Sequence, residues 1–220
     1  MASVKGLQTG RVIQLEGDPG KQFRVLVYIA AIHKTGEKGS WITMASPDAG
    51  DSRGLFFLPE INDEVVVGFI NDDPARAVML GMLYGAEKKP PLPARNDNHQ
   101  KGIFTRSKLR IQFSDDTKTI TIDTPAGNSI ALDENGSKVV IKDQHHNTIT
   151  MQSTGIRLES TQQVEIKAAG NLLLSAGASI NIKASTISIE SAASLIMKAA
   201  STKLSAAGIT EIVGSLVKIN

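Results

Sequence analysis

The last third of the chain repeats one short pattern, and this repeat restricts the fold more than any other feature. From Gly155 to Asn220, two apolar residues separated by one other residue return about every eight positions. Residues two apart on a β-strand point to the same side, so each pair marks a short strand with one apolar face. The pairs are Ile156/Leu158, Val164/Ile166, Leu172/Leu174, Ile180/Ile182, Ile187/Ile189, Leu195/Met197, Leu204/Ala206 and Val217/Ile219, with Ile212 alone. So regular a spacing predicts a fibre-like repeat rather than a compact domain.

Composition excludes several classes of protein. With 41% hydrophobic and 21% charged residues, the 220-residue chain is not expected to be disordered. The net charge of +2 is too small to indicate a nucleic-acid partner. The absence of cysteine excludes disulfides, thiolate metal sites and a catalytic thiol. No segment approaches the ~18 consecutive apolar residues that a membrane-spanning helix needs.

The region from Leu7 to Gly85 predicts a small barrel. Alternating apolar residues and β-branched or aromatic side chains mark five strands, at residues 10–15, 23–29, 40–44, 64–69 and 77–83. Five strands in so short a region fit the oligonucleotide/oligosaccharide-binding (OB) barrel, although the pattern also allows an SH3-like barrel.

The rest of the chain divides into a linker and a long β region. Residues 86–100 combine three prolines with polar residues, as a semi-rigid linker does. Apolar alternation then resumes between Leu109 and Met151 with a longer spacing, because turn sequences intervene. We therefore expect an all-β chain with an OB-like barrel (1–85), a linker (86–102) and a β-helix spike (103–220).

The repeat is expected to need partners. One pair buries two medium-sized side chains, which does not offset the ~1–2 kcal/mol of backbone entropy lost per ordered residue. Two arrangements would bury the apolar pairs. One is a single-chain solenoid, and the other is three intertwined chains that leave no free strand edge. We favour the trimer, with three repeats per turn. Its predicted core consists of Ile156, Leu158, Val164, Ile166, Leu172, Leu174, Ile180, Ile182, Ile187, Ile189, Leu195 and Met197.

The order of barrel, linker and octads resembles a known family. The barrel segment Gly54–Phe69 contains a Pro-x-x-x-Asp-x-Val motif, and Thr124–Ser129, Val139–Gln144 and Asn147–Met151 follow the linker. Together they resemble the central spikes of contractile injection systems. This family comprises the VgrG proteins of type VI secretion, phage baseplate assembly protein V and the spikes of extracellular tail-like particles. The resemblance extends from about Gly10 to Asn220.

The resemblance implies a fold and a role. The fold would be an OB barrel followed by an intertwined, homotrimeric, triple-stranded β-helix. The role would be a structural needle that punctures a target membrane and carries a tip protein or an effector, without enzymatic activity or cofactor. It would assemble in the cytoplasm on hub, baseplate and tail-tube proteins and then be secreted or injected. The larger N-terminal hub domain of many family members is expected to be a separate chain or to lie outside this sequence.

The end of the apolar column is the expected docking surface for a tip protein. In the resembling family, a conical protein with Pro-Ala-Ala-Arg (PAAR) repeats covers this end. The predicted platform consists of Leu216, Val217, Lys218, Ile219 and Asn220. The alternative is that these residues fold over and cap the column themselves.

No group of residues predicts catalysis, a cofactor or a metal site. His145 and His146 are adjacent and would point to opposite sides of a strand, so we expect them to be exposed in a turn unless three copies form a ring of imidazoles. Other candidates have structural explanations: turns for Asp72–Asp73 and Asp115–Asp116, solvated loop charges for Asp48, Asp51 and Arg53, and core packing for Trp41 and Tyr28.

Two other functions compete with a spike. The first is an OB module, trimerised by its tail, that binds nucleic acid or glycan. The second is a single-chain β-helix enzyme acting on polysaccharide, which would need several carboxylates in a cleft. The only carboxylate side chains after Asp143 are Glu159, Glu165, Glu190 and Glu211. We therefore favour the spike of a type VI secretion system, a phage tail or an extracellular tail-like particle.

Overall fold

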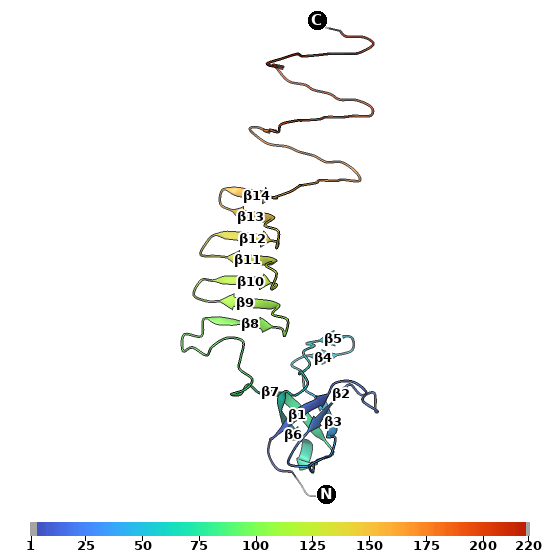
Figure 1. Ribbon diagram of the computed structural model, residues 1–220, viewed down its shortest axis with the longest axis vertical. Helices are drawn as coiled ribbons and strands as arrows, with labels where there is room; N and C mark the ends of the chain where they lie inside the picture. Colours follow the sequence, from blue (N-terminus) through green and yellow to red (C-terminus); the bar gives the residue numbers. More distant parts are fainter. Residues whose placement is uncertain (1–3, 219–220) are drawn as a thin grey trace. The chain divides into compact units, whose positions relative to one another are not determined.

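The computed structural model describes residues 4–218, in which the assigned strands end at Glu159 and one short 3-10 helix, η1 (Ile70–Asp72), occurs (Figure 1). No helix within residues 4–218 is long and apolar enough to cross a membrane. The chain separates into two units, one ending at Gln163 and the other beginning at Val164.

The N-terminal region is a closed five-stranded barrel. Its strands are β1 (Gln8–Gln14), β2 (Arg24–Tyr28), β3 (Ser40–Met44), β6 (Glu64–Phe69) and β7 (Ala77–Met82). They close in the order β1-β2-β3-β7-β6, with β3 and β7 parallel and the other neighbours antiparallel. The chain thus passes β7 between β3 and β6, as a Greek-key barrel requires. Each of the five predicted strands overlaps an observed one, so the predicted barrel is confirmed.

A small hairpin in the β3–β6 connection was not predicted. It consists of β4 (Ala49–Gly50) and β5 (Arg53–Gly54), which pair antiparallel. Strands of two residues are too short to show alternation in the sequence.

Small branched side chains fill the barrel. The buried core consists of Val12, Val25, Val27, Ile29, Ile42, Val65, Val67, Ala77 and Met79. Trp41 and Tyr28 are only half-buried and lie outside this cluster, so their prediction as core residues is wrong. The Tyr28 ring instead stacks on the His33 imidazole, with 5.5 Å between the ring centroids. A five-stranded barrel has room for valine and isoleucine inside but places bulky rings on its wall.

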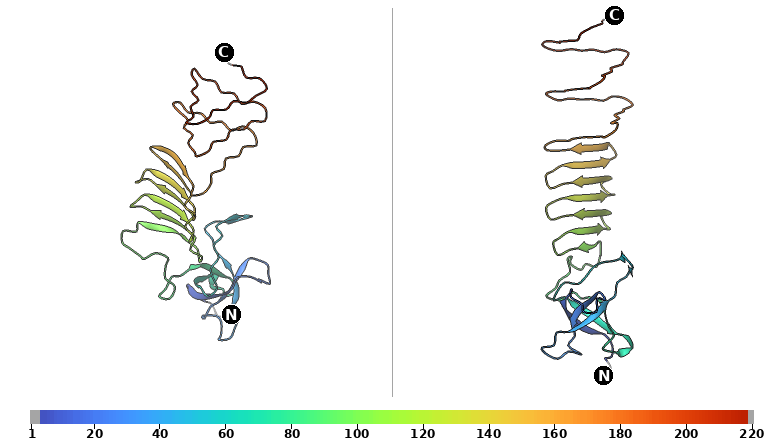
Figure 2. Two further views of the ribbon diagram at one scale, coloured as in Figure 1. Left: turned by 45° about the horizontal axis from the view of Figure 1, so that its top comes forward. Right: turned by 90° about the vertical axis from the view of Figure 1, so that its right-hand side faces the viewer.

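A second sheet follows the linker region. Its seven strands are β8 (Gln100–Phe104), β9 (Arg110–Ser114), β10 (Thr119–Asp123), β11 (Ser129–Asp133), β12 (Lys138–Lys142), β13 (Thr148–Gln152) and β14 (Gly155–Glu159). They lie in sequence order, and each pairs antiparallel with the strand before it (Figures 1 and 2). β8 begins inside the predicted linker 86–102.

The turns on one side of this sheet share one conformation. Three five-residue turns begin at Thr105, Thr124 and Asp143, which are 19 positions apart. In each turn the N–H of the first residue donates to the carbonyl of the fifth, at 2.9–3.1 Å. The fourth residue of each has a positive φ, at Lys108, Gly127 and His146. A 19-residue hairpin repeat therefore precedes the octads.

The sheet corrects one expectation about intertwining. Three interleaved chains were expected throughout residues 103–220. Strands β9 to β13 have both edges paired within their own chain, so no foreign strand can lie between them. The reason is the turns of two to five residues, which return each strand beside its predecessor.

The second unit is an open coil. Straight segments are separated by bends at residues 161–162, 169–170, 177–178, 185, 192–193, 200, 207–208 and 215. Within the described chain, no residue from Ser160 to Lys218 makes a backbone–backbone hydrogen bond, and successive turns of the coil lie apart (Figures 1 and 2). The bends confirm the period of the repeat. The strands expected there are not paired in the isolated chain, because a strand needs a neighbour for its N–H and C=O groups.

Two glycines in the β2–β3 connection allow a matched test of the barrel. Gly39 has a φ of +105°, and a Cβ atom there would lie 2.6 Å from the Val27 carbonyl oxygen. Gly36 has a similar φ of +93° but open space around it. We expect Gly36→Ala to lower the unfolding free energy by about 1 kcal/mol through backbone strain alone. Gly39→Ala should cost clearly more, measured by denaturant unfolding; equal losses would contradict a tight contact at Val27.

Candidate assembly interface

One face of the seven-stranded sheet is continuous apolar surface. The strand register stacks the apolar side chains into two columns, each member being the cross-strand partner of the next. One column contains Ile103, Ile111, Ile122, Ile130, Ile141, Ile149 and Leu158; the other contains Phe113, Ile120, Leu132, Val139, Met151 and Ile156. Alternation of side chains along each strand places all of them on the same face.

This face is uncovered in the single chain. Most of its side chains from β8 to β13 are 38–44% exposed, and Ile156 on the edge strand is 77% exposed. The barrel core, by comparison, is at most 8% exposed. Burying apolar surface contributes about 25 cal/mol per Å², and continuous apolar patches of this kind mark interaction surfaces. The sheet is therefore one layer of an incomplete core.

The opposite face of the sheet is polar and has partners of its own. The Arg110 Nε–H donates to both carboxylate oxygens of Asp123 at 2.7 Å. Gln112 donates to Gln100 at 2.6 Å, and Gln100 donates to the Ser114 hydroxyl at 2.8 Å. Because these polar side chains are satisfied within one chain, this face needs no further protein layer.

The coil keeps its apolar pairs on one side. The predicted core residues from Val164 to Met197 are 50–71% exposed. Leu173 and Ile196, each in the middle of a pair, are 87% and 83% exposed. The pair members are less exposed than the residues between them, although nothing packs against either. This difference indicates that the pair members face the inside of the coil. This pattern supports the predicted core, and their place in an assembled core stays a prediction.

The predicted tip platform is described in part. Leu216 is 79% exposed, Val217 is 48% exposed and Lys218 is exposed. Ile219 and Asn220 lie outside the described residues. Leu216 thus points away from the coil and Val217 into it, and docking there remains a prediction.

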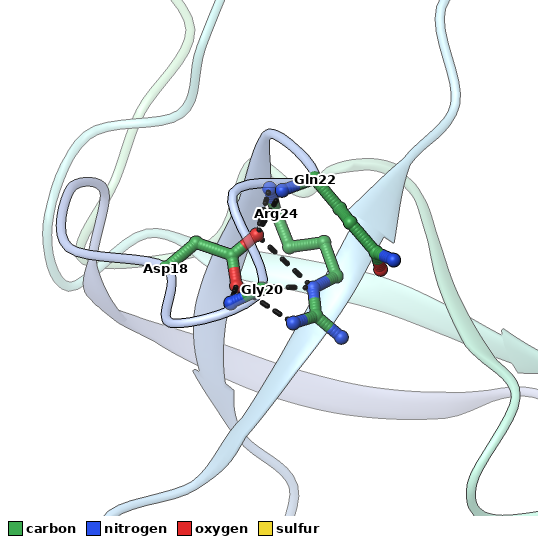
Figure 3. A network of polar contacts seen from close by, with 4 residues as sticks. All are labelled: Asp18, Gly20, Gln22 and Arg24. Atoms are coloured by element: carbon green, nitrogen blue, oxygen red, sulfur yellow. Dashed lines mark hydrogen bonds and ion pairs between the residues drawn. The ribbon is translucent and has the colours of Figure 1, made fainter.

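The most strongly perturbed ionisable group lies in the β1–β2 loop (Figure 3). The Asp18 carboxylate accepts hydrogen bonds from the Arg24 guanidinium, at 2.7 Å from Nη2, and from the backbone N–H groups of Gly20 and Gln22 at 2.9 and 2.8 Å. Arg24, followed by these backbone donors, holds the pKa of Asp18 far below its ordinary value. Gly20 and Gln22 belong to the same loop and Arg24 is the first residue of β2, so the network closes the turn before β2 and is not a catalytic site.

Two turns of the sheet use aspartate in the same way. The Ser114 hydroxyl donates to Asp116 at 2.7 Å and lowers the pKa of that carboxyl. The Asn147 side-chain amide donates to Asp143 at 2.7 Å and lowers its pKa as well. These carboxylates stabilise the turns, as predicted for Asp115–Asp116.

The other candidate residues lie apart from one another. His145 and His146 are exposed in a turn, with His146 at a φ of +68°. Asp48 forms an ion pair with Arg53 that links β4 to β5. Asp73 accepts a hydrogen bond from the Ala75 N–H at 2.9 Å. Residues 4–218 contain no group of three or more His, Asp or Glu side chains that could hold a metal ion.

A second apolar surface on the barrel was missed. Phe23 in the β1–β2 loop and Phe56 after β5 lie with their ring centroids 5.9 Å apart, and both are exposed, as is Phe57. The sequence pattern predicts Phe23 as the first residue of a strand, whereas the observed strand β2 begins at Arg24. The signal that could have identified the surface is the uninterrupted apolar run Leu55–Leu58 beside a turn, which alternation does not explain.

Comparison with known proteins identifies relatives. Residues 8–84 match the family described as the type VI secretion system/phage-baseplate injector OB domain. The chain is 30% identical over 110 residues to the type VI secretion system spike protein VgrG1a of Pseudomonas aeruginosa, covering 47% of this chain and 17% of that protein. It is 28% identical over 151 residues to the actin cross-linking toxin VgrG1 of Vibrio cholerae, covering 64% of this chain and 13% of that protein.

A further relative is the type VI secretion system spike protein VgrG3 of Vibrio cholerae, 26% identical over 119 residues, covering 50% of this chain and 12% of that protein. These matches confirm the resemblance to the VgrG and baseplate spike family, and they resolve the choice between OB and SH3-like barrels in favour of OB. The chain spans less than a fifth of the length of each of these relatives.

Asp18 predicts a pH dependence. Its pKa is lower in the folded chain than the value near 3.9 of an unfolded chain, so its stabilising contribution is complete above about pH 4 and is lost as pH falls through the folded pKa. Asp18→Asn should therefore lower the unfolding temperature at neutral pH, and the difference from the unchanged chain should shrink under acid conditions. A difference that stays constant between pH 7 and pH 2 would contradict this role.

Neighbouring substitutions test which side of the coil is buried on assembly. Ile180→Asp would place a charge among the inward pair members, and Asn181→Asp would place the same charge on the opposite side. We expect Ile180→Asp to abolish assembly, because an unpaired buried charge costs several kcal/mol, whereas Asn181→Asp should change stability by no more than about 0.5 kcal/mol. Size-exclusion chromatography and thermal unfolding measure both effects. Equal effects would disprove the inward assignment.

Proposed function

Because residues 8–84 belong to the injector OB-domain family of type VI secretion systems and phage baseplates, we propose that this chain is the trimeric spike of a contractile injection system. The machine is a type VI secretion system, a phage tail or an extracellular tail-like particle. The chain acts as a structural element, a rod that is driven through a target membrane with a tip protein or an effector attached.

The uncovered apolar face of the β8–β14 sheet carries this proposal. A sheet with a single apolar face needs a second layer, and in a homotrimer three such faces enclose one dry core between them. In this arrangement each chain supplies one wall of a three-sided prism with residues 100–159. Beyond that point the open coil leaves room for the strands of two other copies, so residues 164–218 intertwine.

The assembled rod would suit mechanical work. Its strands lie across the axis, so their backbone hydrogen bonds run along it, at ~4.8 Å per strand. A load on one end is then carried by many hydrogen bonds and by a close-packed column of side chains, which compresses little. The isolated coil has no such bonds among its described residues, and it gains stiffness only on assembly. This function requires no cofactor.

The partners follow from the same role. The barrel, with exposed Phe23, Phe56 and Phe57, is the part that would contact hub, baseplate and tail-tube proteins. Leu216 to Asn220 would hold the conical PAAR tip protein, supported by the exposed Leu216 side chain. The spike would assemble in the cytoplasm on the baseplate and be delivered outside the cell. One relative carries the name of a toxin, which supports an effector attached to the spike as its cargo.

The oligomeric state tests the proposal directly. We expect sedimentation equilibrium and native mass spectrometry to give three times the chain mass at all concentrations above the micromolar range. The trimer should resist heat and detergent, because unfolding one chain exposes the core of all three. A folded monomer that survives dilution would refute the spike and favour a solenoid.

A further inference from the structure

The charges of the octad region follow a rule that the apolar pairs do not explain. In the coil, the second and fourth residues after each bend are the inward positions, and the third and fifth face outward. One outward row steps by seven or eight residues from Arg157 to Lys218, and a second row steps in the same way from Glu159 to Val213. Every charged residue from 157 to 218 lies in one of these rows.

The proposed trimer determines which residues of an outward row become neighbours on adjacent strands. The inference therefore rests on the proposed function. Each repeat moves the chain to the next wall and rises by one strand spacing, so a chain returns to the same wall after three repeats. On each wall, two strand positions therefore lie between successive strands of one chain, and strands of the other two copies fill them. By threefold symmetry, repeat n of one copy then lies beside repeat n+1 of the second copy, and each row runs up one wall through all three copies in turn.

The first two repeats match in charge. Arg157 of one copy would lie beside Glu165 of the next, and Glu159 beside Lys167. In the isolated chain these side chains pair along the strand instead, Arg157 with Glu159 at 2.8 Å and Lys167 with Glu165 at 2.9 Å. Within each pair, both side chains therefore lie on the same side of their segment and are able to exchange partners. Opposite charges on adjacent strands stabilise a sheet, and like charges destabilise it.

The remaining charges obey the same rule. The outward rows contain two further runs of charged neighbours, Lys183–Glu190–Lys198 and Lys203–Glu211–Lys218. Every charged neighbour in both rows is therefore of opposite sign. Sliding one copy by one repeat would break the threefold symmetry and remove these attractions from both of its interfaces. One of these interfaces would then pair repeat n with n+2 and place lysine beside lysine at 167/183, 183/198 and 203/218. A single-chain solenoid, which pairs repeat n with n+3, would keep only Glu159 beside Lys183 and Lys167 beside Glu190.

We infer that the two rows are intermolecular ion-pair ladders that recognise a second copy of this chain and set its register, with repeat n of one copy beside repeat n+1 of the next. The apolar pairs cannot do this, because each repeat offers nearly the same Ile, Leu, Val or Met side chains and would pack equally well after a slip. The charged rows distinguish the repeats from one another, so they supply specificity where the core supplies only stability.

Engineered disulfides in the cysteine-free chain test the register. In the inferred register, outward residues 181 and 188 of different copies lie on adjacent parallel strands, within the reach of a disulfide. Asn181→Cys with Ser188→Cys should give a covalent trimer on a denaturing gel after oxidation. Asn181→Cys with Ile196→Cys spans two strand spacings, ~9.6 Å, and should not cross-link. Asn181→Cys with Lys203→Cys would close within one chain only in a solenoid.

The outcomes separate the register from the trimer. Cross-linking of 181 to 188 alone is the expected result. A trimer by mass that cross-links 181 to 196 and not to 188 overturns the register and leaves the spike standing. A monomer that cross-links 181 to 203 overturns both.

Charge reversal gives an independent readout. Glu190→Lys places three lysines in a row, and Ser188→Lys adds the same charge beside the neutral Asn181 and Ile196. We expect Glu190→Lys to lower the unfolding temperature of the trimer more than Ser188→Lys does, with a difference that shrinks at high salt. The triple variant Lys183→Glu, Glu190→Lys, Lys198→Glu should recover the loss. Equal effects of Glu190→Lys and Ser188→Lys, without recovery in the triple variant, would refute the ladder.

Discussion

The pairing of strand edges is the constraint on which the whole structure depends. Each backbone N–H and C=O group needs a partner, and this chain meets the need in three ways. The barrel closes on itself, so it has no free edge. The sheet from Gln100 to Glu159 pairs each strand with its sequence neighbour. The coil after Ser160 makes no such pairs among its described residues, and in the proposed trimer it would obtain them from the other chains.

The sequences of the turns decide where the paired sheet ends and the unpaired coil begins. Five-residue turns with a left-handed fourth position reverse the chain and bring the next strand back beside the last. After β14, bends of one or two residues change direction without reversing it. Alanine, serine and glycine are common at these bends. Apolar residues two positions apart mark the strands in both regions, so the choice between a meander and an open coil lies in the residues between the strands.

The same distinction explains how far the sequence could be interpreted. The five barrel strands and the octad period were predictable, because alternation and turn residues are local signals. Pairing partners were not, since a strand at Ile130 and one at Ile180 show the same pattern although one pairs within its chain and the other does not. Trp41 and Tyr28 were placed in the core by alternation alone, which does not say which side of a barrel wall is inside. The exposed Phe23 and Phe56 come together from separate loops, a contact that no local pattern contains.

The meander has an odd number of strands, and this parity has a geometric consequence. With seven strands, the chain enters the sheet at one lateral edge and leaves β14 at the other. Inserting a complete 19-residue hairpin would lengthen a wall by two strand spacings, roughly 10 Å, and leave the exit direction unchanged. Inserting a single strand would instead move the exit of the chain to the other lateral edge. If the chain must leave the sheet at a fixed edge, the sheet can change length only by whole hairpins.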